Sequence, residues 1–429
     1  MTPATGAGSS GERSGLVRRR IVCADDFERL ARRRLPRPVF DAVAGGAGDE
    51  STIRFNRAGF EQVVLRPRAL SGVSVVDAST TVLGQPVSMP LMLAPTGSTY
   101  MCDPAAEFAL VRATGRAGTV FALSSAASSP CEDIAAAATG PLWYQLYPPR
   151  DRSAADQLLG RLEVSGYSVL CVTIDTPLPP RRDRDLRNGL NKPLRITPRL
   201  MLGAAAHPRW TARFLFGKSG ADNRRSVFAG TRSLGNLSSM LSQLAPVTED
   251  DLRWLRDRWR GKLVVKGVMR ADEVPRLIGL GVDGIVVSNH GGRNLDSGQA
   301  SILVLPEVIE AAGSAEVFVD GGIRRGTDVI KALGLGARAC LIGRPYVWAL
   351  GGGGEAGVDR LLEILREEIE LAMAFSGCAT VSDIDASVVR LRSLPSPAAG
   401  GEQPAEREAD AIEQVLQSQD GESVGLLPS

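Results

Sequence analysis

Residues 316–345 read EVFVDGGIRRGTDVIKALGLGARACLIGRP, and this stretch decides the fold. Two short apolar runs, 316–320 and 339–343, flank a segment with the apolar spacing of an amphipathic helix. Gly321, Gly322 and Arg324 follow the first run, and the second run ends at Gly343 with Arg344 directly after it. A strand, a helix and a second strand, with polar chemistry at both strand ends, are typical of a parallel sheet joined by crossover helices.

The same pattern repeats through the middle of the chain. Six earlier apolar runs are 90–94 (PLMLA), 119–123 (TVFAL), 142–146 (LWYQL), 168–173 (SVLCVT), 262–266 (KLVVK) and 284–288 (GIVVS). Eight strands that alternate with helices predict an α/β protein with a closed (β/α)8 TIM barrel. An open Rossmann-type sheet is the alternative, and it is weakened because no G-x-G-x-x-G follows an early strand.

The segments around the strands suggest one large domain over residues 23–392. Residues 25–46 predict short helices, which form an N-terminal helical extension of the barrel. The connection after the fourth strand, about 176–261, is far longer than an ordinary loop and predicts an insertion that covers the active site. Residues 1–22 and 393–429 are poor in apolar residues, so we expect disordered tails, with one short helix over 406–417.

Composition excludes several classes of partner. Lys+Arg 50 against Asp+Glu 48 gives a net charge of +2, which provides no global field for a nucleic acid. The six cysteines have no metal-ligand spacing, so we expect no metal site and a reducing, cytoplasmic location. The chain has neither a signal-like start nor about 18 consecutive apolar residues. The apolar patch at 212–218 allows at most peripheral membrane contact.

Polar residues gather where the predicted strands end, and in a TIM barrel these ends converge on one mouth. After the last two strands, glycines whose N–H groups can approach an anion stand beside arginines that can bind it bidentately. The residues of this predicted phosphate site are Asp320, Gly321, Gly322, Arg324, Gly343 and Arg344. A phosphorylated cofactor or substrate is therefore expected.

The sixth strand is followed by SNHGGRNLD (288–296). The imidazole of His290 can accept a proton at neutral pH, and Arg293 offers a planar fork for a substrate carboxylate. The chain has one other histidine, His207, which lies in the long insertion and is expected to be structural or at the surface.

Together these motifs resemble the FMN-dependent 2-hydroxy acid oxidases and dehydrogenases, a family that includes glycolate oxidase, lactate oxidase, and lactate and mandelate dehydrogenases. The resemblance covers residues 24–390. The motifs that carry it are LRPRAL, MPLMLAPTG, ALSS, WYQLY, TIDTP with Arg181-Arg182, VVKGV, SNHGGRNLD, VDGGIRRGTDVIKALGLGA and IGRP. It implies FMN at the barrel mouth, a small-molecule substrate, oxygen or a quinone or other carrier as electron acceptor, and a homotetramer.

The resemblance also implies roles for individual residues. His290 resembles the catalytic base and Asp175 the carboxylate that orients it. Arg293 and Arg182 resemble the clamps for the substrate carboxylate, and Tyr147 the phenol that contacts the substrate. The expected FMN-binding residues are Pro95, Thr96, Gly97, Ser124, Gln145, Thr173, Lys266, Ser288, Asp320, Gly321, Gly322, Arg324, Gly343 and Arg344. Lys266 resembles the cation beside flavin N1 and O2, and Asp320 the partner of a ribityl hydroxyl.

Three positions depart from the common pattern of the family. Ala42 stands where a tyrosine hydroxyl is usual, and Ala126 where some short-chain oxidases carry a tryptophan. Two small residues predict a wider pocket and a bulkier substrate, aryl or long-chain. Gly97 resembles the dehydrogenase members more than the oxidases.

Other functions remain possible from the sequence. An alanine at position 42 resembles the family branch that oxidises peptide-derived intermediates in mycofactocin maturation. That branch, however, lacks an arginine at the position of Arg293. Oxidation of an α-amino or peptide-derived carbon is therefore the alternative reaction. A non-catalytic flavin-binding barrel, or a phosphate-binding barrel enzyme without flavin, would also fit part of the pattern.

Overall fold

A computed structural model describes residues 21–149, 151–189, 198–216 and 246–392. By its internal contacts the chain forms a compact unit up to Arg390 and a separate segment from Leu391 onward, of which Leu391 and Arg392 are described. The predicted tails, the helix expected at 406–417, and residues 217–218 of the apolar patch lie outside the described residues. The domain boundaries at 22/23 and 392/393 therefore stay a prediction.

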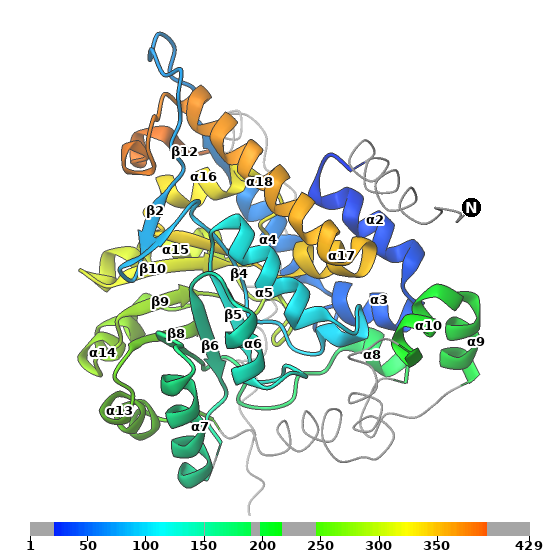
Figure 1. The fold of residues 1–429 in the computed structure, drawn as a ribbon. Coiled ribbons are helices and arrows are strands. Elements are labelled where there is room, and N and C mark those ends of the chain that lie inside the picture. Colours follow the sequence, from blue (N-terminus) through cyan, green and yellow to red (C-terminus); the bar gives the residue numbers. More distant parts are fainter. Residues whose placement is uncertain (1–20, 150, 190–197, 217–245, 393–429) are drawn as a thin grey trace, which may run out of the picture. The chain divides into compact units, whose positions relative to one another are not determined.

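Eight parallel strands close into a barrel at the centre of the molecule (Figure 1). They are β4 (Leu91–Leu93), β5 (Phe121–Ser124), β6 (Leu142–Leu146), β7 (Val169–Thr173), β8 (Lys262–Val268), β9 (Gly284–Val287), β10 (Glu316–Asp320) and β11 (Ala339–Ile342). The order β10-β11-β4-β5-β6-β7-β8-β9 follows the chain around the ring, because β11 pairs with β4. The predicted TIM barrel is confirmed, and the open-sheet alternative is wrong.

Helices surround the barrel, as the alternating pattern predicted (Figure 1). They are α5 (Ala106–Ala117), α6 (Cys131–Ala137), α7 (Arg152–Val164), α13 (Glu249–Arg258), α14 (Val274–Gly279), α15 (Ser301–Ala312), α16 (Gly326–Gly334), α17 (Arg344–Gly353) and α18 (Glu355–Ser376). Short 3-10 turns are η1 (Thr99–Met101), η2 (Ala271–Glu273), η3 (Val381–Asp383) and η4 (Ala386–Val388).

The long connection after β7, expected as an insertion over about 176–261, contains several helices. Its described parts contain α8 (Asp183–Arg187), α9 (Pro198–Ala206) and α10 (Pro208–Phe216). The next helix, α13, directly precedes β8 and starts with a capping box between Thr248 and Asp251. Because α13 is an ordinary barrel helix, the insertion ends before Glu249.

The barrel interior is filled with side chains, so it is a packed core and not a channel. Trp143 and Phe318 meet edge to face there, with ring centroids 5.5 Å apart. The hairpin of β2 (Thr80–Val82) and β3 (Gln85–Val87) adds Val82 and Val87 to the same core. Gln85 of this hairpin accepts a hydrogen bond from the Trp143 indole. The hairpin therefore closes the end of the barrel away from the mouth.

The N-terminal extension comprises α2 (Ala24–Arg34), α3 (Arg37–Ala44) and α4 (Ser51–Gln62). The first two helices match the prediction. The third was missed, because the side that it buries is partly polar and includes Thr52 and Asn56. After α4, β1 (Val63–Leu65) forms a small sheet with β12 (Val389–Leu391).

The described residues contain neither a helix suited to span a membrane nor a cluster of metal ligands. None of the helices that the structure describes is long and apolar enough to cross a membrane. No group of three or more His, Cys, Asp or Glu side chains that could hold a metal ion occurs in the described parts of the chain. All six cysteines are buried thiols without a disulfide.

Candidate active site

An irregularity at the end of β8 shapes one side of the barrel mouth. The register between β8 and β9 shifts between Lys266 and Val268, and Gly267 at the bulge has φ +109°. A Cβ atom on Gly267 would lie 2.5 Å from the Cβ of Asp175, closer than side chains can approach. Gly267 therefore lets Asp175 approach this strand. It lies in the VVKGV motif, but it was not singled out from the sequence.

Lys266, directly before the bulge, is a buried cation with two partners. Its Nζ lies 2.9 Å from Asp320 Oδ2 and donates a 2.7 Å hydrogen bond to Ser288 Oγ. Burial opposes the charge, but attraction to Asp320 and Asp175 outweighs it and raises the pKa of Lys266 above its usual value. The strand ends of β8, β9 and β10 therefore hold a permanent positive charge between them.

His290 and Asp175 form a hydrogen-bonded pair, as the sequence predicted. His290 Nδ1 lies 2.9 Å from Asp175 Oδ1 and 3.1 Å from Oδ2. Asn294 Nδ2 donates to the Asp175 backbone carbonyl at 2.9 Å, and this bond fixes the backbone of Asp175. Burial opposes ionisation of Asp175, but attraction to His290 and Lys266 prevails and lowers the pKa of Asp175. The ionised carboxylate occupies Nδ1, which leaves the other ring nitrogen for a substrate.

The backbone at His290 is held in a conformation that non-glycine residues avoid. His290, Gly291 and Gly292 have φ values of +56°, +63° and +72°. For a residue with a Cβ atom, this left-handed conformation costs roughly 1–2 kcal/mol. His290 N donates to Ser288 Oγ at 3.0 Å, and Ala47 N donates to Gly292 O at 3.0 Å. The surrounding structure therefore fixes the direction of the imidazole.

Two predicted carboxylate-binding arginines, Arg293 and Arg182, lie beside this turn. Arg293 donates to the carbonyls of Ala42, Val43 and Gly45 at 3.0–3.2 Å, so the end of α3 fixes its guanidinium. Arg182 Nε donates to Arg293 O at 3.1 Å. Burial lowers the pKa of both arginines, and for Arg293 the nearby charge of Arg182 adds to this effect.

Further groups face these arginines. Asp185 Oδ2 lies 3.6 Å from Arg182 Nη1, a pairing that the sequence analysis missed. Burial raises the pKa of Tyr147, and Asp175 is the second cause of that rise. The structure thus brings Tyr147, Arg182 and Arg293 together with the His290 and Asp175 pair.

Residues at the mouth have polar atoms that fit a bound flavin. Ser124 Oγ donates to Gln145 Oε1 at 3.0 Å, which leaves the Gln145 Nε2 donor buried without a partner. Asp320 Oδ1 is a buried acceptor without a partner, although its other oxygen pairs with Lys266. Buried polar atoms rarely stay unpaired, so both atoms suit a ligand that supplies an acceptor and a hydroxyl. The heterocycle and ribityl chain of FMN provide those groups.

The predicted phosphate site also fits its ligand. Gly343 caps the N-terminus of α17, and a Cβ atom on it would meet nothing within 4 Å, so the space beside it is open. Burial, with repulsion from neighbouring arginines, lowers the pKa of Arg344 to about 9 and that of Arg324 to about 10. Arg344 Nε is buried and unpartnered. A phosphate dianion at the helix terminus would satisfy this donor and offset the repulsion.

The other residues expected at the cofactor lie at strand ends around the same mouth. Thr173 ends β7, Ser288 directly follows β9, and Gly321 and Gly322 follow β10 with φ +90° and +93°. The remaining residues expected at the cofactor, Pro95, Thr96 and Gly97, lie in the loop that follows β4. A Cβ on Gly97 would lie 2.5 Å from that of Ala126, so the exits of β4 and β5 pack closely.

Comparison with known proteins identifies the family. A model described as FMN-dependent dehydrogenase matches residues 31–391. The chain belongs to this family. Mouse 2-hydroxyacid oxidase 1 is 41% identical over 382 residues, which cover 87% of this chain and 98% of the mouse protein. An L-lactate oxidase from a Nostoc species is 40% identical over 372 residues, which cover 85% of this chain and 97% of that oxidase.

Solved structures of the family agree in fold. A structure titled as the monotopic membrane protein (S)-mandelate dehydrogenase superposes with a TM-score of 0.81 at 35% identity, over 86% of this chain and 99% of that protein. A mandelate oxidase superposes with a TM-score of 0.74 at 34% identity, over 86% of this chain and 98% of the oxidase. The chain is thus an FMN-dependent 2-hydroxy acid oxidoreductase, as its motifs predicted.

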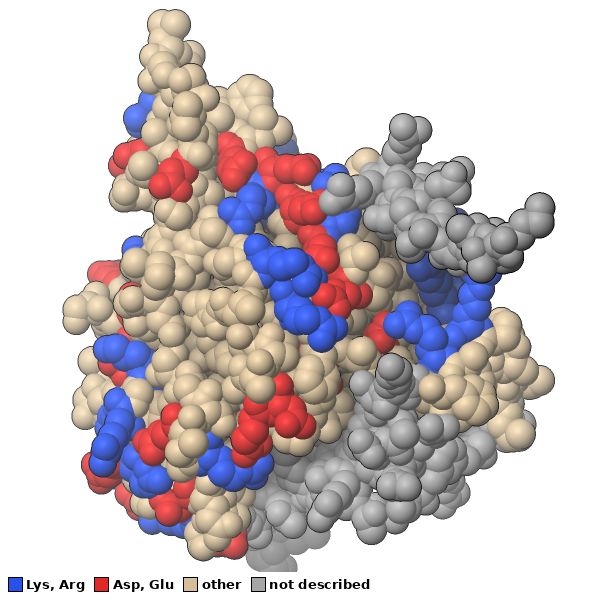
Figure 2. Space-filling model, viewed as in Figure 1, with Lys and Arg blue, Asp and Glu red and all other residues tan. Residues whose placement is uncertain are grey.

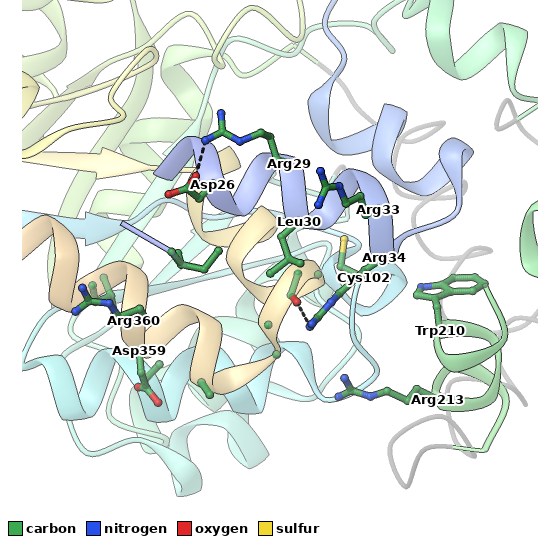
Figure 3. Close-up of a pocket in the computed structure, with 18 of the residues that line it drawn as sticks. Asp26, Arg29, Leu30, Arg33, Arg34, Cys102, Trp210, Arg213, Asp359 and Arg360 are labelled. Atoms are coloured by element: carbon green, nitrogen blue, oxygen red, sulfur yellow. Dashed lines mark hydrogen bonds and ion pairs between the residues drawn. The ribbon is translucent and has the colours of Figure 1, made fainter. Parts of the chain in front are cut away.

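A separate cavity of about 1760 Å³ lies among α2, α5, α10, α17 and α18. Arginines line much of it (Figure 3), and Lys and Arg atoms gather between α2 and α10 in Figure 2. Some are already neutralised: Arg213 pairs with Asp103 at 2.6 Å and Arg116 with Asp359 at 2.8 Å. None of the predicted site residues lines this cavity, so it is distinct from the candidate site at the barrel mouth.

His207, in contrast to His290, belongs to that separate cavity. It follows α9, and its Nδ1 lies 2.8 Å from the carbonyl oxygen of Gly203 in the same helix. This local contact agrees with the structural or surface position expected from the sequence.

Proposed function

We propose that His290 is the base that takes the hydroxyl proton of a bulky 2-hydroxy acid as its α-carbon is oxidised. The observation that carries this proposal is the 2.9 Å contact between His290 Nδ1 and an ionised Asp175, on a strained turn at the mouth. Bound FMN supplies the acceptor for the α-hydrogen and two electrons. The second ring nitrogen of His290 receives the proton.

The residues around His290 divide the remaining tasks. Asp175 stabilises the imidazolium that forms when the proton arrives, because its negative charge is already in contact with the ring. Arg182 and Arg293 bind the substrate carboxylate and thereby orient the α-carbon. Tyr147 contacts the substrate, and Lys266 stabilises negative charge at the cofactor.

The proposal of a bulky substrate rests on residues with small side chains. Ala42 contributes only its carbonyl, which accepts a hydrogen bond from Arg293, and offers no hydroxyl to the substrate. Gly97 and Ala126 lie against each other at the exits of β4 and β5. These small residues favour an aryl or long-chain 2-hydroxy acid over glycolate. The mandelate oxidase and dehydrogenase among the structural relatives carry names that contain such an aryl acid.

The electron acceptor, oxygen or a quinone or other carrier, is part of the same proposal. Gly97 favours a dehydrogenase, through its resemblance to those members. We further infer a homotetramer from the family resemblance, a cytoplasmic location from the scattered cysteines, and at most peripheral membrane contact through the apolar patch. Ala42 keeps one second candidate open, which is oxidation of an α-amino or peptide-derived carbon.

An anaerobic substrate screen tests this function. The holoenzyme is mixed with 2-hydroxy acids from glycolate to mandelate and long-chain acids, with amines and peptide-derived compounds beside them, while the flavin absorbance is followed. Bleaching is expected with bulky 2-hydroxy acids, and reoxidation by oxygen or a quinone analogue then identifies the acceptor. Bleaching only by amines or peptides would replace the proposed substrate class with the second candidate.

A further inference from the structure

Asn56 on α4 makes a reciprocal pair of hydrogen bonds with Asn289, the residue before His290. Asn56 Nδ2 donates to Asn289 Oδ1 at 2.9 Å, and Asn289 Nδ2 donates to Asn56 Oδ1 at 2.8 Å. Asn56 is buried, with a relative exposure of 2% for the whole residue. The N-terminal extension thus reaches directly into the segment that contains the proposed base.

The pairing completes the hydrogen bonding of Asn289. Asn289 Nδ2 also donates to Gln299 O at 2.8 Å, and Oδ1 also accepts from Gly292 N at 3.2 Å. A side-chain amide has two N–H donors and two acceptor positions, so Asn289 uses all four. Two of these four bonds depend on Asn56, which must offer both a donor and an acceptor.

The bonds of Asn289 enclose the left-handed turn. Asn289 precedes the turn, and its Oδ1 accepts from Gly292 N at the end of the turn. The amide therefore spans the three residues with positive φ, with His290 as the first of them. If Asn289 rotates, Gly292 N loses its bond to Asn289 Oδ1 and keeps only its 3.0 Å bond to the Asn289 backbone carbonyl, so the turn that contains His290 is held less tightly.

Asn56 also lies against the neighbouring strand exit and the start of α15. A Cβ atom on Gly321 would be 3.2 Å from Asn56 Nδ2 and 3.3 Å from Asn289 Oδ1. Ser301 N donates to Asn56 Oδ1 at 3.3 Å. The amide pair is thus packed between the His290 turn and the glycines that follow β10, with little freedom to move.

We propose that Asn56 is a positioning residue: through Asn289 it holds the left-handed turn and thereby aims the His290 imidazole at the substrate. This inference rests on the proposed role of His290 as the base. Asn56 does not touch the substrate. A displacement of the base by about 1 Å can slow a reaction by about 100-fold, so a distant substitution is sufficient to reveal this role.

Two substitutions change the pair in graded steps. Asn56→Asp keeps an acceptor for Asn289 Nδ2 and Ser301 N, but it loses the donor to Asn289 Oδ1. Asn56→Leu has a similar size and loses both functions, so a buried donor and a buried acceptor of Asn289 lose their partner. We expect anaerobic flavin reduction to slow by about 10-fold in the first variant and about 100-fold in the second.

Thr52→Val is the matched control on the same helix. The Thr52 hydroxyl donates to Leu295 O at 3.2 Å and accepts from Gly298 N at 2.9 Å, farther along the same loop. The valine keeps the shape and removes both bonds. It should lower the melting temperature as much as Asn56→Asp does, but leave the rate of flavin reduction within about threefold of the wild type.

The affinity for a substrate analogue distinguishes a misdirected His290 imidazole from a general loosening of the site. A substrate analogue with a methyl group in place of the α-hydrogen binds but cannot be oxidised, and the flavin spectrum reports its dissociation constant. Because α3 holds the Arg293 clamp independently, we expect this constant to change less than threefold in both Asn56 variants. FMN content, measured by absorbance, should stay that of the wild type.

The outcomes distinguish the two levels of the inference. Wild-type reduction rates in both Asn56 variants, alongside loss of reduction in His290→Asn, would overturn the role of Asn56 alone. Equal slowing in Thr52→Val and Asn56→Asp, or a parallel loss of analogue binding, would also overturn it, because the loop would then depend on general stability. Full reduction in His290→Asn would instead overturn the proposed base.

Discussion

Replacement of Asp175 by asparagine removes one negative charge from the proposed base pair and leaves its shape intact. The two side chains are largely buried, with exposures of 23% for His290 and 13% for Asp175, and lie 2.9 Å apart. At this distance, unit charges attract by about 6 kcal/mol with an effective dielectric constant of about 20. A hydrogen bond to a charged group contributes roughly 1.5–3 kcal/mol. Partial solvent access places the expected loss between these values, at about 3–5 kcal/mol.

A loss of this size, felt when the imidazole becomes charged, corresponds to flavin reduction that is roughly 100- to 5000-fold slower. The assay is anaerobic stopped-flow reduction of the holoenzyme by its best 2-hydroxy acid, after FMN content is matched by absorbance. Thr176→Val is the control, since the Thr176 hydroxyl, a neutral donor, donates a hydrogen bond to Asp175 Oδ1 at 3.2 Å. It should slow reduction by less than about 10-fold. Slowing below threefold in Asp175→Asn would refute the stabilisation of an imidazolium by Asp175.

Three further predictions follow from the same geometry. Gly267→Ala should destabilise the protein by at least about 1–3 kcal/mol in urea unfolding, because its φ of +109° disfavours a side chain and the new Cβ would meet Asp175; an unchanged midpoint would contradict the fit. Ala42→Tyr should raise kcat/KM for glycolate relative to that for mandelate by about 10- to 200-fold. An unchanged ratio would show that Ala42 does not determine substrate size. Arg344→Gln should weaken FMN binding by about 10- to 150-fold and riboflavin binding far less in apoprotein titrations, whereas equal weakening of both would exclude a phosphate contact.

The pair of Asp175 and His290 also predicts how the stability of the protein changes with pH. The folded-state pKa of Asp175 lies below its usual value, so its contribution is fully present above about pH 4 and is lost as pH falls through the lower folded value. The difference in unfolding free energy between wild type and Asp175→Asn should therefore shrink below about pH 4. Chemical denaturation across pH 2.5–7 measures it, and a constant difference would contradict the lowered pKa.

The barrel and the gathering of the candidate site residues at its mouth were predictable because both depend on local sequence. Short apolar runs alternate with helical periodicity, and parallel strands bring their ends to one mouth. His290 and Asp175 are 115 positions apart, yet each follows a strand, so their meeting needs only the barrel topology. The motif resemblance supplied the roles that topology alone does not give.

Features that depend on tertiary packing were not predictable. The helix α4 escaped notice because its buried side includes Asn56, whose polarity is satisfied only by Asn289, 233 positions away. Gly267 resembles any glycine after a strand until the approach of Asp175 is known. The contact between Arg293 and the end of α3 likewise needs coordinates, because nothing in the local sequence fixes where a long flexible side chain ends.

The most direct test of the proposed chemistry compares the wild-type holoenzyme with His290→Asn during anaerobic reduction by a bulky 2-hydroxy acid. Both proteins should be yellow and hold equal FMN, because the residues that fit the cofactor are unchanged. Wild-type flavin should bleach, and bleaching in His290→Asn should be about 100- to 10,000-fold slower, the range expected for loss of a positioned base. Bleaching at the wild-type rate in His290→Asn would show that the proton goes elsewhere.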